Sequence, residues 1–152
     1  VRAVTSVHEM LYRSNEIARV EFGSYLRELC KALQAGEATL APVTVHCDPI
    51  DVQLHADQAI PLALIVNELV TNSIKHGLSG VERDTIAVKT SLDGQDLLLQ
   101  VADNGTGKPD DAKPGQGSVI IDGLVVQLGA KMVTAKCSPG YSVTIRIPYE
   151  AV

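Results

Sequence analysis

Four polar residues with different side-chain chemistry recur along one predicted helix. Glu68, Asn72, Lys75 and His76 stand at relative positions i, i+4, i+7 and i+8, directly after the apolar stretch 59–66. The apolar residues of that stretch follow a helical rather than an alternating pattern. In a helix, residues at this spacing lie on one face. The sequence therefore predicts a helix face that presents a carboxylate, an amide, an ammonium and an imidazole together.

Each of these four groups has a use beside a triphosphate. The amide oxygen of Asn72 suits Mg2+, which proteins usually bind through few groups of their own plus substrate phosphates and water. Lys75 offers a point charge to phosphate oxygens. His76 can donate a hydrogen bond to phosphate or ribose, and Glu68 can accept a proton or orient a nucleophile. The alternative is a solvated polar stripe on a half-buried helix.

A second motif follows an apolar run of strand length, Leu97 to Ala102. Asp103 comes directly after this run and before Gly105 and Gly107. A carboxylate held there in an apolar pocket could accept a hydrogen bond from the exocyclic amine of adenine. The glycines would let the backbone approach the base. A plain Asn-Gly surface turn is the alternative, and it is weakened by the helix motif upstream.

The two motifs resemble those of the GHKL ATPases, a group that includes gyrase, MutL and the sensor histidine kinases. Residues 67–77, NELVTNSIKHG, look like the N box of the kinases, and residues 103–107, DNGTG, look like their first glycine box. Within the kinases, the chain is most similar to the bacterial HWE-type and related families. Residues 8–12, 25–29 and 60–69 share in that similarity, which covers nearly the whole chain.

This resemblance implies an α+β fold, a two-layer α/β sandwich of the Bergerat type. In that fold, helices cover one face of a mixed, mainly antiparallel sheet. The resemblance places Asp103 on adenine, Asn72 on Mg2+, and Lys75 and His76 near the phosphates and ribose. ATP and Mg2+ are therefore the implied ligands.

Residues 104–117 are rich in Gly, Pro, Asp and Lys and contain almost nothing apolar. In the resembling kinases this position holds the ATP lid, and Gly115, Gly117 and Ser118 look like the second glycine box. Backbone N–H groups at the start of the following helix could cradle phosphates. A flexible surface loop is the alternative. The Gly-Thr that usually opens the last strand reads Gly140-Tyr141 here, which puts in doubt a hydroxyl contact from this position.

Periodicity and turn residues predict the elements that would position these motifs. Asp57 is the expected cap of the motif helix, with Pro61 near its first turn. The other expected elements are a helix at 24–35 ended by Gly36, a hairpin of 86–92 and 96–102, a helix at 118–128 ended by Gly129, and a hairpin of 130–137 and 141–148. Residues 43–47 are expected to form a strand, with a loop as the alternative because prolines closely flank this segment.

Composition is that of a compact globular protein. The chain has 152 residues, 45% hydrophobic content and a formal net charge of −5, which disfavours binding of nucleic acid through a broad basic surface. No apolar run is long enough to span a membrane, so no direct membrane contact is expected. Three widely spaced cysteines, without a Cys-x-x-Cys pair, indicate neither a disulfide framework nor a zinc site. Buried thiols in a reducing cytoplasm are the preferred interpretation.

The chain begins with Val and with a helical stripe of Val4, Val7 and Leu11, so we interpret it as part of a longer protein. Residues 1–20 are expected to be the end of a dimerisation hairpin helix and a linker, and residues 21–152 a catalytic ATP-binding domain. His8 is expected to be an interface or surface residue, because similar His-Glu-x-Leu-Tyr segments belong to the second helix of the hairpin. The phosphoacceptor histidine would then lie upstream.

The sequence thus predicts the catalytic part of a cytoplasmic sensor histidine kinase, or of the cytoplasmic part of a membrane-attached receptor. ATP would supply its γ-phosphoryl group to a histidine on the hairpin of the same protein, and a response regulator would receive it next. Catalysis would involve Glu68, Asn72 and Lys75, and the full-length protein would be a homodimer. The alternatives are a GHKL serine kinase of the anti-sigma type and a non-catalytic docking scaffold.

Overall fold

The computed structural model describes residues 19–36, 43–77, 84–104, 116–137 and 140–149. Helices and strands are interspersed along this part of the chain. In order they are β1 (Arg19–Glu21), α2 (Phe22–Ala35), β2 (Val43–Asp48), β3 (Gln53–His55), α3 (Ala56–Asn72), the π-helical turn η3 (Ser73–Gly77), β4 (Asp84–Asp93), β5 (Asp96–Asp103), α4 (Gln116–Leu128), β6 (Lys131–Cys137) and β7 (Gly140–Pro148). The expected helix stripe at the start of the chain, with His8, lies outside the described residues.

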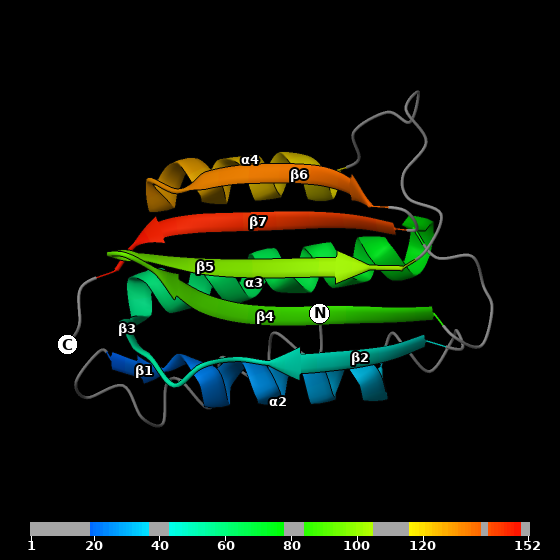
Figure 1. Ribbon diagram of the computed structural model, residues 1–152, viewed down its shortest axis with the longest axis horizontal. Helices are drawn as coiled ribbons and strands as arrows, with labels where there is room; N and C mark the ends of the chain where they lie inside the picture. Colours follow the sequence, from blue (N-terminus) through cyan, green and yellow to red (C-terminus); the bar gives the residue numbers. More distant parts are fainter. Residues whose placement is uncertain (1–18, 37–42, 78–83, 105–115, 138–139, 150–152) are drawn as a thin grey trace.

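Five strands form the main sheet in the order β2-β4-β5-β7-β6. The β2–β4 pair is parallel, and the other three pairs are antiparallel. The helices α2, α3 and α4 lie together behind the sheet in the view of Figure 1. The predicted α+β architecture, with helices layered on one face of a mixed and mainly antiparallel sheet, is confirmed. Among the described residues, no helix combines the length and the hydropathy needed to cross a membrane.

The core lies between the sheet and the helices. Along β5 buried and half-buried residues alternate, as expected for a strand with one face against helices. The three buried apolar residues of β5 are each opposite a buried residue of β7, and the pairs are Leu97 with Ile147, Leu99 with Ile145 and Val101 with Val143. The aliphatic side chains of α3 cover this face, and among them Leu62, Ile65, Val66 and Val70 are fully buried. The strand β5, which ends in Asp103, therefore pairs with β7 along one edge and packs against α3 on its buried face.

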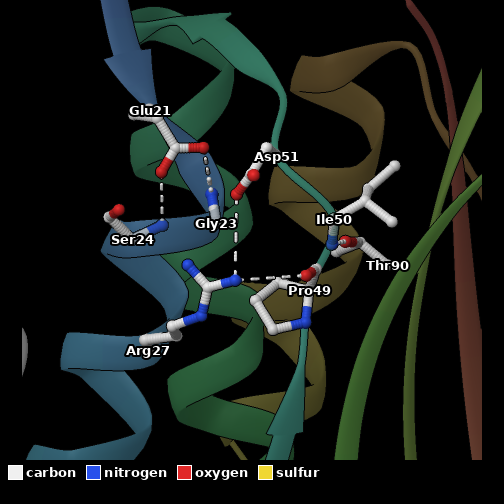
Figure 2. A network of polar contacts seen from close by, with 8 residues as sticks. All are labelled: Glu21, Gly23, Ser24, Arg27, Pro49, Ile50, Asp51 and Thr90. Atoms are coloured by element: carbon white, nitrogen blue, oxygen red, sulfur yellow. Dashed lines mark hydrogen bonds and ion pairs between the residues drawn. The ribbon is translucent and has the colours of Figure 1, made fainter.

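Two predicted helix starts differ from the structure. The α2 helix begins at Phe22 rather than Ser24, because the carboxylate of Glu21 accepts hydrogen bonds from the N–H groups of Gly23 and Ser24, at 3.3 and 2.7 Å (Figure 2). The prediction that Asp57 caps the motif helix is wrong. His55 is the N-cap of α3 and Asp57 lies in its first turn, where a carboxylate still favours the positive end of the helix dipole.

The α2 helix is anchored along the edge strand β2 by polar contacts. The amide of Gln34 donates from Nε2 to the carbonyl of Val43 at 3.0 Å, and its Oε1 accepts from the N–H of Val45 at 2.6 Å. Arg27 donates to the carbonyl of Pro49 at 3.5 Å and lies 3.8 Å from the carboxylate of Asp51 (Figure 2). These contacts fix the helix against the first strand of the sheet.

The predicted hairpins and helix ends are otherwise found close to their expected positions. Asp93 pairs with Asp96 across Gly94, whose φ of 61° explains the need for glycine in this turn. Gly129 ends α4 with a φ of 63°. A small antiparallel sheet of β1 and β3 was not predicted.

Candidate functional site

The two sequence motifs meet where α3 ends and β5 ends. The hydroxyl of Ser73 donates a hydrogen bond of 3.0 Å to Oδ2 of Asp103, thirty positions later in the chain. Asp103 is buried, with 8% of its surface exposed. A carboxylate is rarely buried unless it is hydrogen-bonded, so this contact both satisfies the group and fixes its orientation. The residue after Asn72 thus connects the helix motif directly to the glycine motif.

Backbone pairing fixes Asp103 from two sides. It is opposite Ile86 in β4 and opposite Tyr141 in β7. The next residue, Asn104, donates its N–H to the carbonyl of Thr85 at 3.3 Å and accepts from the N–H of Thr85 through Oδ1 at 2.8 Å. The strand therefore remains paired one residue beyond Asp103.

Gly140 leaves no room for a side chain beside Asp103. Its φ is +116°, and a Cβ built on it would lie 1.9 Å from the carbonyl oxygen of Asp103. Only glycine permits this backbone conformation together with this contact. The first residue of β7 thus sets the position of the main chain that carries the buried carboxylate.

The four residues of the predicted helix face fall on α3 and on the turn after it. Glu68 and Asn72 are half-buried, and Asn72 is the last residue of α3. Lys75 is exposed in η3, and the backbone of His76 belongs to the same turn. The expectation of one regular helix through His76 is wrong, because the helix widens to a π-helical turn at Ser73. Such turns occur frequently at functional sites.

The glycines of the two predicted boxes lie mainly outside the described residues. These are Gly105, Gly107 and Gly115, together with the expected lid that contains Lys108 and Lys113. The backbone of Gly117 and Ser118 belongs to the first turn of α4, which begins at Gln116 and packs against α3. His46 and His55 are both exposed.

Three residues that shape the site were not singled out from the sequence for these roles. They are Ser73, Thr85 and Gly140, which contact the side chain or backbone of Asp103 and Asn104. In the sequence, Gly140 stood out only as part of the Gly140-Tyr141 pair, in which tyrosine replaces the expected threonine. Ser73 and Thr85 are small polar residues, and no spacing rule connects them to a strand end elsewhere in the chain.

Comparison with known proteins agrees with this arrangement. The family described as histidine kinase-, DNA gyrase B-, and HSP90-like ATPase matches residues 57–151, and a family described as histidine kinase matches residues 1–36. The blue-light-activated histidine kinase 2 of Erythrobacter litoralis is 29% identical over 154 residues, covering 92% of this chain and 44% of that protein. The sensor protein LytS of Staphylococcus haemolyticus is 36% identical over 100 residues, covering 62% of this chain and 17% of that protein. This chain thus spans less than half the length of these relatives.

A similar solved structure is the histidine kinase domain of a blue-light-activated histidine kinase from Erythrobacter litoralis. It matches with a TM-score of 0.84 at 25% identity, and the match covers 97% of this chain and 73% of that one. The matched family covers the helix motif, the buried Asp103 and the whole main sheet after β2. The chain therefore belongs to the family of histidine kinase-, DNA gyrase B- and HSP90-like ATPases.

Proposed function

We propose that this chain is the ATP-binding catalytic part of a sensor histidine kinase. In the whole protein it would transfer the γ-phosphoryl group of ATP to a histidine on an upstream dimerisation hairpin, and from there to a response regulator. The observation that carries the proposal is the hydrogen bond between Ser73 and the buried Asp103, because it unites the two parts of the expected nucleotide site. The match of a histidine kinase family to residues 1–36 favours histidine over serine as the acceptor.

The residues at this site have the chemistry that ATP and Mg2+ require. A buried carboxylate, held by the Ser73 hydroxyl, suits recognition of the exocyclic amine of adenine. Asn72, at the helix end beside Ser73, offers an uncharged oxygen for Mg2+, and Lys75 offers a charge to the phosphates. Bound Mg2+ would neutralise charge on the phosphate oxygens.

The protein's own contribution to phosphoryl transfer is positioning and electrostatic stabilisation. Asp103 would hold the base, and the turn η3 would bring Lys75 and His76 to the phosphate end. Glu68 lies one turn before Asn72 and would orient the attacking imidazole of the acceptor. We expect this face of α3 to meet the incoming histidine.

The direct test is calorimetric titration of this chain with Mg-ATP. We expect saturable binding at one site per chain. Absence of binding to a chain that is folded by circular dichroism would overturn the proposal. In the longer protein, the phosphorylated product should lose its phosphate in acid, as phosphohistidine does, whereas an acid-stable product would indicate a serine kinase.

Replacing Asn72 by Ala should remove the dependence of nucleotide affinity on Mg2+. We expect the parent chain to bind ATP about tenfold more tightly with Mg2+ than with a chelator, a difference of about 1.4 kcal/mol. The variant should show the same affinity under both conditions, because the amide ligand is gone. Titrations with and without Mg2+ measure this, and Thr71→Ala, an adjacent change on α3, is the control. A variant that still responds to Mg2+ would exclude Asn72 as a ligand.

Replacing Ser73 by Ala should weaken Mg-ATP binding about fivefold, since a hydrogen bond to a buried acceptor contributes about 1 kcal/mol. The effect would be indirect, through the orientation of the Asp103 carboxylate. Ser73→Thr keeps the hydroxyl and should bind nearly as the parent does. Equal affinities for the Ala variant and the parent would show that Asp103 is held in place without Ser73.

A further inference from the structure

The α2 helix runs antiparallel to β2, so that residues near the end of the helix contact the start of the strand and earlier residues contact its end. Near the end of the helix, Gln34 contacts Val43 and Val45 at the start of the strand. Two turns earlier, Arg27 contacts Pro49, just after the strand ends. Cys30 on the helix and Cys47 on the strand lie between these two pairs of contacts. The fold therefore brings together two cysteines that stand seventeen positions apart in the sequence.

The two thiols contact each other and are not equivalent. They share a hydrogen bond, and both sulfurs are free rather than joined in a disulfide. Cys30 is 4% exposed and belongs to the core, whereas Cys47 is half-buried at the strand edge. A reagent from solvent would therefore reach Cys47 before Cys30.

The surroundings make Cys47 the more easily ionised of the two thiols. The hydrogen bond from Cys30, aided by the charge of Arg27, lowers the pKa of Cys47 against the opposing effects of burial and Asp48. The same hydrogen bond, together with burial, raises the pKa of Cys30. Arg27 is held beside this strand by Pro49 and Asp51, as Figure 2 shows. A half-buried thiol with a lowered pKa, placed beside a second thiol, is an arrangement that favours oxidation of the pair.

We propose that Cys30 and Cys47 form a peroxide-oxidisable dithiol, with Cys47 as the attacking thiolate and Cys30 as the resolving thiol. The Cys47 sulfur would attack hydrogen peroxide, breaking the O–O bond, and become a sulfenic acid while hydroxide leaves. The Cys30 sulfur would then form the S–S bond as the S–O bond of the sulfenic acid breaks. The Cys30 proton joins the departing hydroxide to give water. In total, two thiols are oxidised to a disulfide and one peroxide is reduced to two waters.

The disulfide would lock α2 to the edge of the main sheet. The strand β4 lies between β2, which carries Cys47, and β5, which carries Asp103. Cys47 is opposite Val88 of β4, and Asp103 is opposite Ile86 of β4. The dithiol and the nucleotide site are thus separate, and this inference does not depend on the proposed function. Closing a loop of this length should raise Tm by roughly 5–10 °C.

The test uses the 152-residue chain with Cys137→Ser, so that the pair holds both remaining thiols. After treatment with equimolar hydrogen peroxide and alkylation, intact mass should show loss of two hydrogen atoms and of both alkylation sites. Peptide mapping should give a reducible cross-link between Cys30 and Cys47. The Tm should rise on oxidation and return on reduction.

Single variants separate the two roles. In Cys30→Ser, Cys47 should stop at a sulfenic acid that dimedone captures. In Cys47→Ser, Cys30 should keep its thiol over the same time. Arg27→Gln, which leaves both cysteines in place, should slow the reaction several-fold. Oxidation of the parent without a cross-link, or unchanged reactivity of Cys30 in Cys47→Ser, would overturn the proposal.

Discussion

Replacing Asp103 by Asn should lower the affinity for Mg-ATP about 100-fold, equivalent to about 2.7 kcal/mol, while the fold is retained. The carboxylate has two acceptor oxygens, and Ser73 donates to one of them. The amide carries an oxygen at only one of these two positions, so if that oxygen accepts from Ser73, the NH2 group faces the adenine amine donor to donor. It also loses the charge that strengthens these hydrogen bonds.

Calorimetric titration of the parent and of Asp103→Asn measures this effect. Asp93→Asn is the matched control, because it makes the same chemical change at the turn of the same hairpin, beside Arg146. We expect the control to bind Mg-ATP as the parent does, and both variants to have the circular dichroism of the parent. Binding by Asp103→Asn within threefold of the parent would exclude Asp103 as the recognition group for the base.

Replacing Gly140 by Ala should lower the free energy of unfolding by about 3 kcal/mol or more. Two costs combine here. The new side chain would have a φ of +116°, which is strained for any residue with a Cβ. Its Cβ would also fall 1.9 Å from the carbonyl oxygen of Asp103, so backbone must move in a paired strand. Because the displaced residue is Asp103, we expect Mg-ATP affinity to fall as well.

Two other glycines separate the contact from the backbone strain. Gly94 has a φ of +61° with no atom within 4 Å of an added Cβ, so Gly94→Ala should cost only about 1–2 kcal/mol. Gly123 lies inside α4, also with open space, and Gly123→Ala should add up to about 1 kcal/mol. Denaturant titrations of the three variants measure this order. If Gly140→Ala is no less stable than Gly94→Ala, the contact with Asp103 relaxes without cost.

The predictable parts of the fold are those with local signals. The β4–β5 hairpin was marked by Asp93-Gly94 between two apolar runs, and α4 was marked at its end by Gly129. The parallel pairing of β2 with β4 has no local signal, because it joins strands separated by α3. The β1–β3 pair is three residues long on each side and is also non-local. Tertiary contacts decide both.

The candidate site divides in the same way. Asp103 and the polar residues of α3 could be predicted because their types and order indicate nucleotide chemistry. The turn η3 could not, because helical spacing assumes a constant pitch, and the widened turn appears only in the structure. The Ser73 hydroxyl and the close approach of Gly140 depend on which strand ends lie together. No residue pattern in a single sequence carries that information.

The amide of Gln34 has a consequence for association between chains. The outer edge of β2 would otherwise present the carbonyl of Val43 and the N–H of Val45 to any extended segment that approaches. Gln34 occupies both groups in the geometry that a neighbouring strand would use. The Gln34 side chain, which comes from the helix α2, thus makes two of the backbone hydrogen bonds that an additional strand would make. We therefore expect it to hinder strand addition at this part of the edge and so to disfavour edge-to-edge aggregation.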